Sequence, residues 1–210
     1  MEASMELRQL RAVLFDMDGT LVTSDAAVER AWTTWASEYG VDPVEVLSEA
    51  HGAPAESTVD RMLPQLDLPA RTAAAARQLE LQYDDLSGVS AAPGAAEVLA
   101  VLEQRGLPWA VVTSADQRLA KVRLGAAGID TPLLVTIEDI TRGKPDPEGY
   151  LRAAELLAVD PQYCLVVEDA EVGLQAGRAA GAQTAALKGL EGDIRLGDLH
   201  QLAALLRTGE

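Results

Sequence analysis

Two aspartates follow a short apolar segment near the start of the chain. Asp16 and Asp18 come directly after the apolar run 12–15 and precede Gly19 and Thr20. Such a run is typical of a buried strand, and parallel α/β sheets bind ligands beyond the carboxyl ends of their strands. Neighbouring carboxylates repel each other unless a cation or a shared proton relieves them, and magnesium prefers oxygen ligands. The segment therefore predicts metal-assisted chemistry, although Asp-x-Asp-Gly also occurs in ordinary polar turns.

Later apolar runs also end in polar side chains. One run ends at Thr113 and Ser114, where a hydroxyl and successive backbone N–H groups can bind phosphate oxygens. Lys144 lies in a proline-containing loop, and its point charge suits a phosphate or a carboxylate. A third run ends at Glu168 and Asp169, which suit a metal ion if they face the first pair of acids. These segments predict one site assembled from several strand ends.

The four segments together resemble a known family. Residues 16–21 resemble the first motif of the haloacid dehalogenase superfamily, and Thr113, Lys144 and Glu168-Asp169 resemble its other three motifs in the same order. The resemblance covers nearly the whole chain. It is strongest to the hydrolases of subfamily I with a small helical cap, which include sugar-phosphate phosphatases and proteins like β-phosphoglucomutase.

The resemblance implies a magnesium-dependent phosphatase that acts on a small phosphomonoester, with a sugar or polyol phosphate as the expected substrate. It implies that Asp16 is the nucleophile, which forms an aspartyl-phosphate, and that Asp18 is the general acid and then the general base. It also implies that Mg²⁺ is held by Asp16, the backbone carbonyl of Asp18 and Asp169, with Glu168 in support.

The resemblance also implies which residues bind the substrate. Thr113, the backbone of Ser114 and Lys144 would hold the phosphate oxygens. His51-Gly52 resembles a His-Gly pair that sugar-phosphate phosphatases carry on the side of the cap facing the active site. By residue statistics alone, the same pair would be the polar end of a helix followed by its terminating glycine.

Three other functions are open alternatives. A dehalogenase of the same superfamily does not need Asp18. A mutase like β-phosphoglucomutase shares the fold and all four motifs, but its cap histidine and phosphate-binding arginine correspond here to Val28 and Ala55. A catalytically silent protein that binds a phosphorylated ligand as a regulator is the third alternative. The cap His-Gly pair continues with Ala53-Pro54 instead of basic residues, so the particular sugar is left open.

Composition narrows the classes of partner. The chain has 210 residues, 48% of them hydrophobic, and a net charge of −16. Nucleic acids and anionic membranes are excluded as main partners, because their binding needs clustered Lys and Arg. No apolar run approaches the roughly 18 residues of a membrane span, and the single cysteine, Cys164, lies in an apolar strand and is expected in the core. We expect a cytoplasmic protein that is a monomer or a weak homo-oligomer.

The pattern of elements predicts how these residues are positioned. From residue 90 onward, strand and helix patterns alternate, which indicates a doubly wound parallel α/β sheet. Between residues 25 and 86 only helical patterns occur, including one amphipathic stripe at 28–39. We therefore expect an α/β core at residues 1–22 and 88–210, with an all-helical cap inserted at 23–87.

Overall fold

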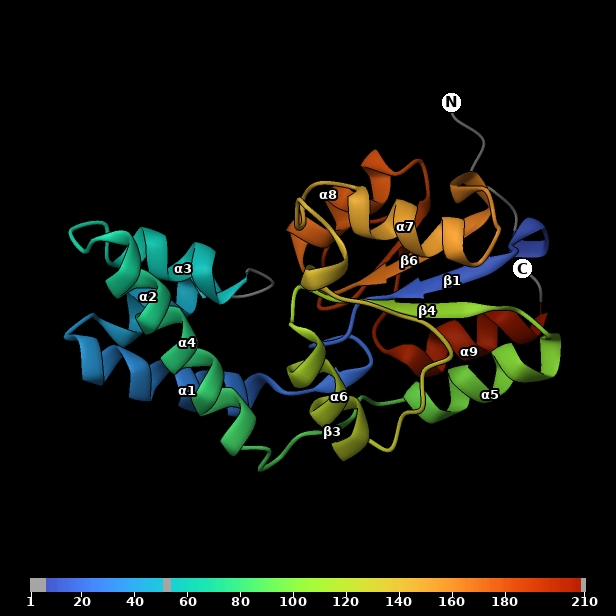
Figure 1. The fold of residues 1–210 in the computed structure, drawn as a ribbon. Helices are drawn as coiled ribbons and strands as arrows, with labels where there is room; N and C mark the ends of the chain where they lie inside the picture. Colours follow the sequence, from blue (N-terminus) through green and yellow to red (C-terminus); the bar gives the residue numbers. More distant parts are fainter. Residues whose placement is uncertain (1–6, 51–53, 209–210) are drawn as a thin grey trace.

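The computed structural model describes residues 7–50 and 54–208 and has two parts, a sheet flanked by helices and a separate group of four helices (Figure 1). All neighbouring strands in the sheet are parallel, which confirms the predicted doubly wound fold. In spatial order the strands are β5 (Leu134–Val135), β4 (Trp109–Val112), β1 (Ala12–Phe15), β6 (Cys164–Glu168), β7 (Gln183–Ala186) and β8 (Ile194–Arg195).

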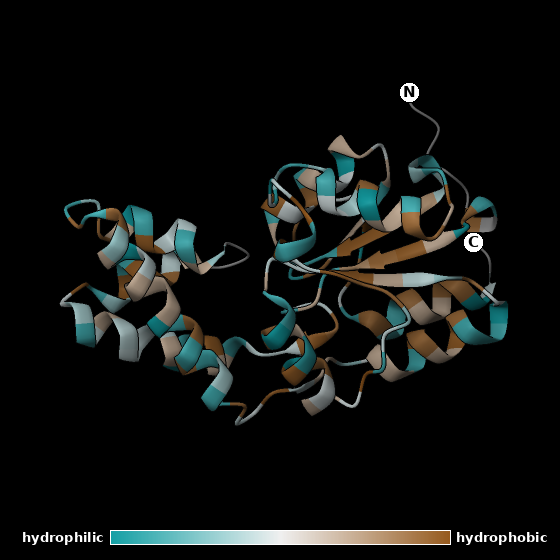
Figure 2. Ribbon diagram, viewed as in Figure 1, coloured by the Kyte–Doolittle hydropathy of each residue, from teal (hydrophilic) through white to brown (hydrophobic). Residues whose placement is uncertain are grey.

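Helices cover both faces of the sheet. Apolar side chains from the helices pack against each face of the central strands, which explains why those strands are continuous apolar runs. Figure 2 shows this as hydrophobic strands enclosed by helices whose outer sides are hydrophilic. One face carries α5 (Ala95–Arg105), α6 (Gln117–Ala126) and α9 (Leu199–Thr208), and the other carries α7 (Glu148–Leu156) and α8 (Glu171–Ala179).

The four inserted helices form a cap with its own apolar core. Trp35 is completely buried, and its indole N–H donates a 2.8 Å hydrogen bond to the backbone carbonyl of Ala74. Trp32 packs edge-on against Trp35 with 5.2 Å between ring centroids. Both tryptophans therefore stabilise the cap. Its helices are α1 (Asp25–Tyr39), α2 (Pro43–Ala50), α3 (Ala55–Met62) and α4 (Leu68–Asp84).

A small antiparallel ribbon lies where the chain enters and leaves the cap. It consists of β2 (Val22–Thr23) and β3 (Ser90–Ala91), paired so that Val22 lies opposite Ala91. The sequence did not predict this ribbon, because two-residue strands carry no periodic pattern. The described part of the chain also includes three short 3₁₀ helices, η1 (Leu7–Gln9), η2 (Ile137–Asp139) and η3 (Pro161–Tyr163).

The register of the central strands brings chemical groups to one edge of the sheet. Phe15, the last residue of β1, lies opposite Val111 of β4 and Val167 of β6. Asp16 and Glu168, which follow Phe15 and Val167, therefore meet at the carboxyl ends of adjacent parallel strands. Within the described segments 7–50 and 54–208, no helix is both long and apolar enough to cross a membrane.

Candidate active site

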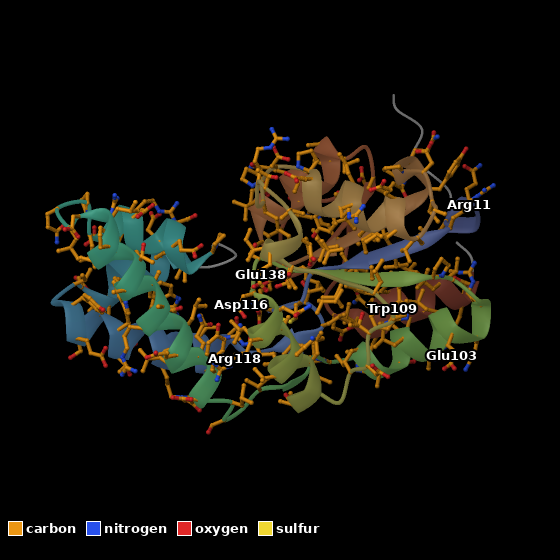
Figure 3. The ribbon with its side chains drawn as sticks, in the orientation of Figure 1. Arg11, Glu103, Trp109, Asp116, Arg118 and Glu138 are labelled. Atoms are coloured by element: carbon orange, nitrogen blue, oxygen red, sulfur yellow. The ribbon has the colours of Figure 1, made fainter. Side chains whose placement is uncertain are left out.

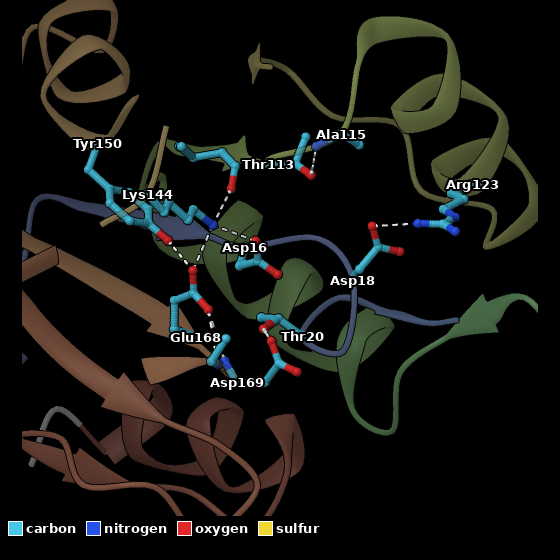
Figure 4. A network of polar contacts seen from close by, with 12 residues as sticks. Asp16, Asp18, Thr20, Thr113, Ala115, Arg123, Lys144, Tyr150, Glu168 and Asp169 are labelled. Carbon is cyan, nitrogen blue, oxygen red and sulfur yellow. Dashed lines mark hydrogen bonds and ion pairs between the residues drawn. The ribbon is translucent and has the colours of Figure 1, made fainter. Parts of the chain in front are cut away.

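A buried lysine joins two of the strand-end acids. The Lys144 Nζ atom lies 2.5 Å from Asp16 Oδ1 and 2.6 Å from Glu168 Oε1, and it donates a 3.0 Å hydrogen bond to the backbone carbonyl of Val112 (Figure 4). Only 7% of the lysine side chain is exposed. Charge-assisted hydrogen bonds of this length fix both carboxylates relative to the sheet.

The charges of this cluster are strongly coupled. Burial raises the pKa of Asp16, the carboxylates of Glu168 and Asp169 raise it further, and the Lys144 ammonium opposes them. Burial alone would lower the pKa of Lys144, but the carboxylates of Asp16 and Glu168 outweigh burial and raise it. The lysine therefore stays charged, and the crowding of the neighbouring carboxyl groups favours a further cation or a shared proton.

Glu168 is oriented by four donors. Its Oε1 atom accepts a 2.8 Å hydrogen bond from the Tyr150 hydroxyl as well as the bond from Lys144. Its Oε2 atom accepts bonds of 3.1 Å and 3.2 Å from the backbone N–H groups of Asp169 and Ala170, just before α8. Burial and the charge of Glu168 raise the pKa of the Tyr150 phenol, so the tyrosine remains a donor.

Gly173 leaves the space in which the Glu168 carboxylate lies. A Cβ atom at this helical position would overlap both the carboxylate carbon and its oxygens. We expect Gly173→Ala to destabilise the protein by about 1–3 kcal/mol, because the carboxylate would have to leave its donors. Gly125, on α6, has no atom near the position of an added Cβ. Gly125→Ala should therefore be neutral or stabilising by up to about 1 kcal/mol. Denaturant unfolding checks both variants, and equal effects would contradict this account.

Asp169 contacts the loop after β1 and a second lysine. The Thr20 hydroxyl donates to Asp169 Oδ1 at 3.4 Å, and Lys188 Nζ lies 2.9 Å from Asp169 Oδ2. Lys188 also contacts Asp25, the first residue of α1, at 3.1 Å. Gly19 has a φ of +82°, and a Cβ there would overlap the Asp169 carboxylate. The turn after β1 therefore needs glycine for both conformation and space.

Three acidic residues at the strand ends can hold a metal ion. Asp16, Glu168 and Asp169 each offer an oxygen atom, and these atoms lie within 4.8 Å of one another. A hard divalent cation prefers such oxygen ligands, and its charge would relieve the repulsion among the three carboxyl groups. The residues present therefore fit a divalent metal. The side chain of Asp18 does not belong to this cluster, and the predicted contribution of its backbone carbonyl stays a prediction.

Asp18 is held apart from the lysine cluster. Its Oδ1 atom accepts a 2.6 Å hydrogen bond from the Ser24 hydroxyl, and its Oδ2 atom accepts a 2.7 Å bond from the Arg123 guanidinium. Figure 4 shows the carboxylate facing Arg123. The two aspartates of the first motif therefore occupy different electrostatic environments.

Thr113 and Ser114 lie at the end of β4. The buried Thr113 hydroxyl accepts a 3.1 Å hydrogen bond from the backbone N–H of Ala115, which shapes the turn that leads into α6. Thr113 and Ser114 line the same cavity as Asp16 and Asp18. The predicted phosphate-binding segment thus opens into the space beside both aspartates.

A cavity of about 460 Å³ lies between the strand ends and the cap. The core supplies most of its polar lining, whereas the cap segment supplies mainly apolar side chains together with the Ser24 hydroxyl, the Asp25 carboxylate and the Gln82 amide. The predicted contacts of His51 and Gly52 lie outside the described residues and stay predictions. Described residues of the cap segment 23–87 that line the cavity are Ser24, Asp25, Val28, Trp32, Ala50, Pro54, Ala55, Leu79 and Gln82.

Sequence reasoning missed several polar residues of the site. Arg123 and Gln82 lie on amphipathic helices, where a polar residue is normally assigned to the solvent side. Their only signal is a polar residue at a position that the helical period assigns to the buried face. Tyr150 and Lys188 lie outside the four motifs, and nothing in their local sequence indicates contact with Glu168 or Asp169.

The sheet, the cap and the cavity between them define a class of α/β proteins that have an inserted helical cap and a polar site at the carboxyl ends of the strands. Within that class, the chain belongs to the haloacid dehalogenase-like hydrolase family, which its residues 10–181 match. This agrees with the resemblance of the four motifs.

Two curated relatives are similar over most of their length. The chain is 39% identical over 203 residues to hexitol phosphatase A of Escherichia coli (strain K12), covering 94% of each protein. It is 40% identical over 190 residues to 2-deoxyglucose-6-phosphate phosphatase 1 of Saccharomyces cerevisiae, covering 81% of this chain and 77% of that one. The crystal structure of β-phosphoglucomutase from Clostridium difficile superposes with a TM-score of 0.84 at 20% identity, covering 92% of this chain and 93% of that chain. This last likeness shows the fold alone.

Proposed function

We propose that the protein is a magnesium-dependent phosphatase that hydrolyses a small sugar or polyol phosphate. The observation that carries the proposal is the Asp16 carboxylate, which is held by Lys144 at the floor of the cavity beside two further acids. The similarity to proteins named as hexitol and 2-deoxyglucose-6-phosphate phosphatases supports the substrate class.

The separate environments of the two aspartates support different roles for them in the proposed chemistry. An Asp16 oxygen attacks phosphorus and forms an aspartyl-phosphate as the bond to the leaving oxygen breaks, and Asp18 gives that oxygen a proton. Water then attacks the intermediate, Asp18 takes the proton from the water, and Asp16 is released with inorganic phosphate. Asp16, Asp169 and the Asp18 carbonyl, with Glu168 in support, would hold Mg²⁺, which neutralises charge on the transferring group when bound.

The remaining phosphate oxygens need donors from the core. Thr113, the backbone of Ser114 and Lys144 are the proposed donors, because the first two line the cavity and the lysine contacts the nucleophile. The overall charge of −16 disfavours anionic substrates, so these local donors and the metal must supply the attraction.

The cap wall favours a phosphatase over a phosphosugar mutase. A mutase must hold a second phosphate, which requires positive charge on the cap side. The positions where the mutases carry a histidine and an arginine are Val28 and Ala55 here, and both line the cavity as apolar groups. Residues 51–53 are not described, and His51 and Gly52 remain proposed contacts of the sugar.

A phosphate-release screen tests the function. The purified protein would be incubated with magnesium and a panel of hexitol, hexose and deoxyhexose phosphates, phosphoglycolate and nucleotides. We expect fastest release from a sugar or polyol phosphate and none after chelation of the metal. Isomerisation of a sugar phosphate without release would support the mutase. Binding without any turnover would support the regulatory alternative.

The metal assignment makes a separate prediction. Magnesium should raise the melting temperature of the wild type, because a ligand that binds only the folded state stabilises it. Asp169→Asn replaces a charged ligand by a neutral one, so the magnesium concentration needed for half-maximal activity should rise about tenfold or more. Asp130→Asn is a matched control at an exposed position. An unchanged magnesium requirement in Asp169→Asn would remove this residue from the metal site.

A further inference from the structure

A buried chain of polar side chains runs from Asp18 into the cap. Arg123, on α6, is only 3% exposed and donates to Asp18 Oδ2 at 2.7 Å and to Gln82 Oε1 at 2.5 Å. The Gln82 amide nitrogen in turn donates to Gln78 Oε1 at 2.6 Å. Gln78 and Gln82 both lie on α4 of the cap. The chain therefore connects an aspartate of the core with a cap helix.

The donors of arginine fix the direction of every hydrogen bond in this chain. A guanidinium only donates, so Asp18 Oδ2 and Gln82 Oε1 must accept. The Gln82 amide nitrogen then faces Gln78, which must accept through its oxygen. As a result, Gln78 Nε2 and Arg123 Nε have no hydrogen-bond partner among residues 7–50 and 54–208. Unpaired buried donors are unfavourable, so stability alone does not explain why these positions are polar.

The two oxygens of Asp18 have different partners. Oδ2 accepts from the Arg123 guanidinium, and Oδ1 lies 2.6 Å from the Ser24 hydroxyl, which can either donate or accept a hydrogen bond. Together these two contacts fix the orientation of the carboxylate.

The cap helix is anchored to the core beside this chain. The Tyr83 hydroxyl donates to Asp116 Oδ2 at 2.6 Å, and the Arg118 guanidinium lies 4.1 Å from the centre of the Tyr83 ring. Figure 3 shows Asp116 and Arg118 at the end of α6 that faces the cap. These contacts hold α4 against α6, so the place of Gln82 relative to Arg123 is defined by the docked cap.

We propose that Arg123 is a positioning residue for Asp18 and that Gln82 of the cap fixes its geometry. This inference rests on the proposed phosphatase function. In the first step Asp16 bonds to phosphorus, the bond to the leaving oxygen breaks, and Asp18 gives a proton to that oxygen. An alkoxide leaving group needs this proton, whereas a nitrophenolate leaves readily without it.

Leaving-group dependence tests the inference. For Arg123→Met we expect kcat/KM to fall about 30-fold or more on the best sugar or polyol phosphate, since a positioned general acid contributes about 10²–10⁴-fold. On 4-nitrophenyl phosphate, which shares the phosphate but not the poor leaving group, we expect a loss of less than about threefold. Gln82→Leu should also lower kcat/KM selectively for the sugar or polyol phosphate, but by a smaller factor. The double variant should have a kcat/KM no lower than that of Arg123→Met. Arg123→Lys should recover part of the selective activity.

The outcomes separate this inference from the phosphatase proposal. If the wild type releases no phosphate from either substrate, the phosphatase proposal fails. If the wild type is active and the kcat/KM of Arg123→Met falls equally for both substrates, or for neither, Arg123 does not position Asp18. Circular dichroism monitors folding. If Arg123→Met does not fold, Gln82→Leu and Arg123→Lys carry the test, and an unchanged ratio of the kcat/KM values for the two substrates in both variants overturns the proposal.

Discussion

Replacing Asp16 by asparagine is expected to reduce phosphate release by about 10⁴-fold or more, because an amide of the same shape cannot attack phosphorus. The fold should persist. Burial and two neighbouring carboxylates already raise the pKa of Asp16, so a neutral side chain suits this position. The asparagine oxygen can still accept the hydrogen bond that Lys144 now gives to the aspartate. We expect the free energy of unfolding to change by no more than about 1 kcal/mol.

Single-turnover assays and denaturant unfolding would measure both quantities. Asp130→Asn, at an exposed position, controls for the loss of one negative charge and should retain wild-type activity. Asp16→Asn retaining more than about a hundredth of the wild-type rate would contradict the covalent mechanism, since loss of such a nucleophile typically costs several orders of magnitude.

The long elements of the fold could be predicted because their local signals agree with their tertiary environment. Helix α1 ends at Gly40, whose φ of +68° suits glycine, and α2 begins at Pro43, where a missing N–H does no harm. Strands β2, β3 and β8 have two residues each, too few to show a period. The pairing of β2 with β3 depends on where the fold places the two cap linkers, and the pairing of β8 with β7 depends on the path of the chain after β7.

Sequence patterns likewise indicate some residues of the candidate site and not others. Asp16 directly follows the apolar strand β1, and Glu168 is the last residue of the apolar strand β6, so a local pattern leads to both. The partners of these acids come from helices and loops far away in the chain. Nothing near Tyr150 indicates that its hydroxyl donates to Glu168, and nothing near Arg123 indicates that it contacts Asp18. Such contacts are set by tertiary packing and have no periodic signal in one sequence.

Replacing Lys144 by methionine tests the centre of the charge cluster. The ammonium is the group that neutralises Asp16 and Glu168 within the buried cluster, and its removal leaves both carboxylates without a cation. Breaking a buried ion pair on one side typically costs about 3–5 kcal/mol, and we expect a loss of this size at neutral pH without metal. Activity should fall about 10³-fold or more, because the nucleophile is displaced and the phosphate loses a cation. Lys121→Met, at an exposed position, is the matched control.

The stability of Lys144→Met relative to the wild type should depend on pH in one direction. The pKa of Asp16 is already raised in the wild type, and loss of the opposing ammonium raises it further. A carboxyl group with a raised pKa binds more protons in the folded state than in the unfolded state, so stability falls as pH rises through the interval between the ordinary and the raised pKa. The Lys144→Met variant should therefore recover stability relative to the wild type as pH is lowered from 7 towards 5.

Two further measurements distinguish loss of charge balance from loss of packing. Adding Glu168→Gln to Lys144→Met removes one uncompensated charge and should restore part of the stability without restoring activity. Magnesium should stabilise Lys144→Met more than it stabilises the wild type, because the acids then lack their internal cation. A Lys144→Met protein as stable as the wild type from pH 5 to pH 8, with the same response to magnesium, would show that Lys144 does not balance these acids.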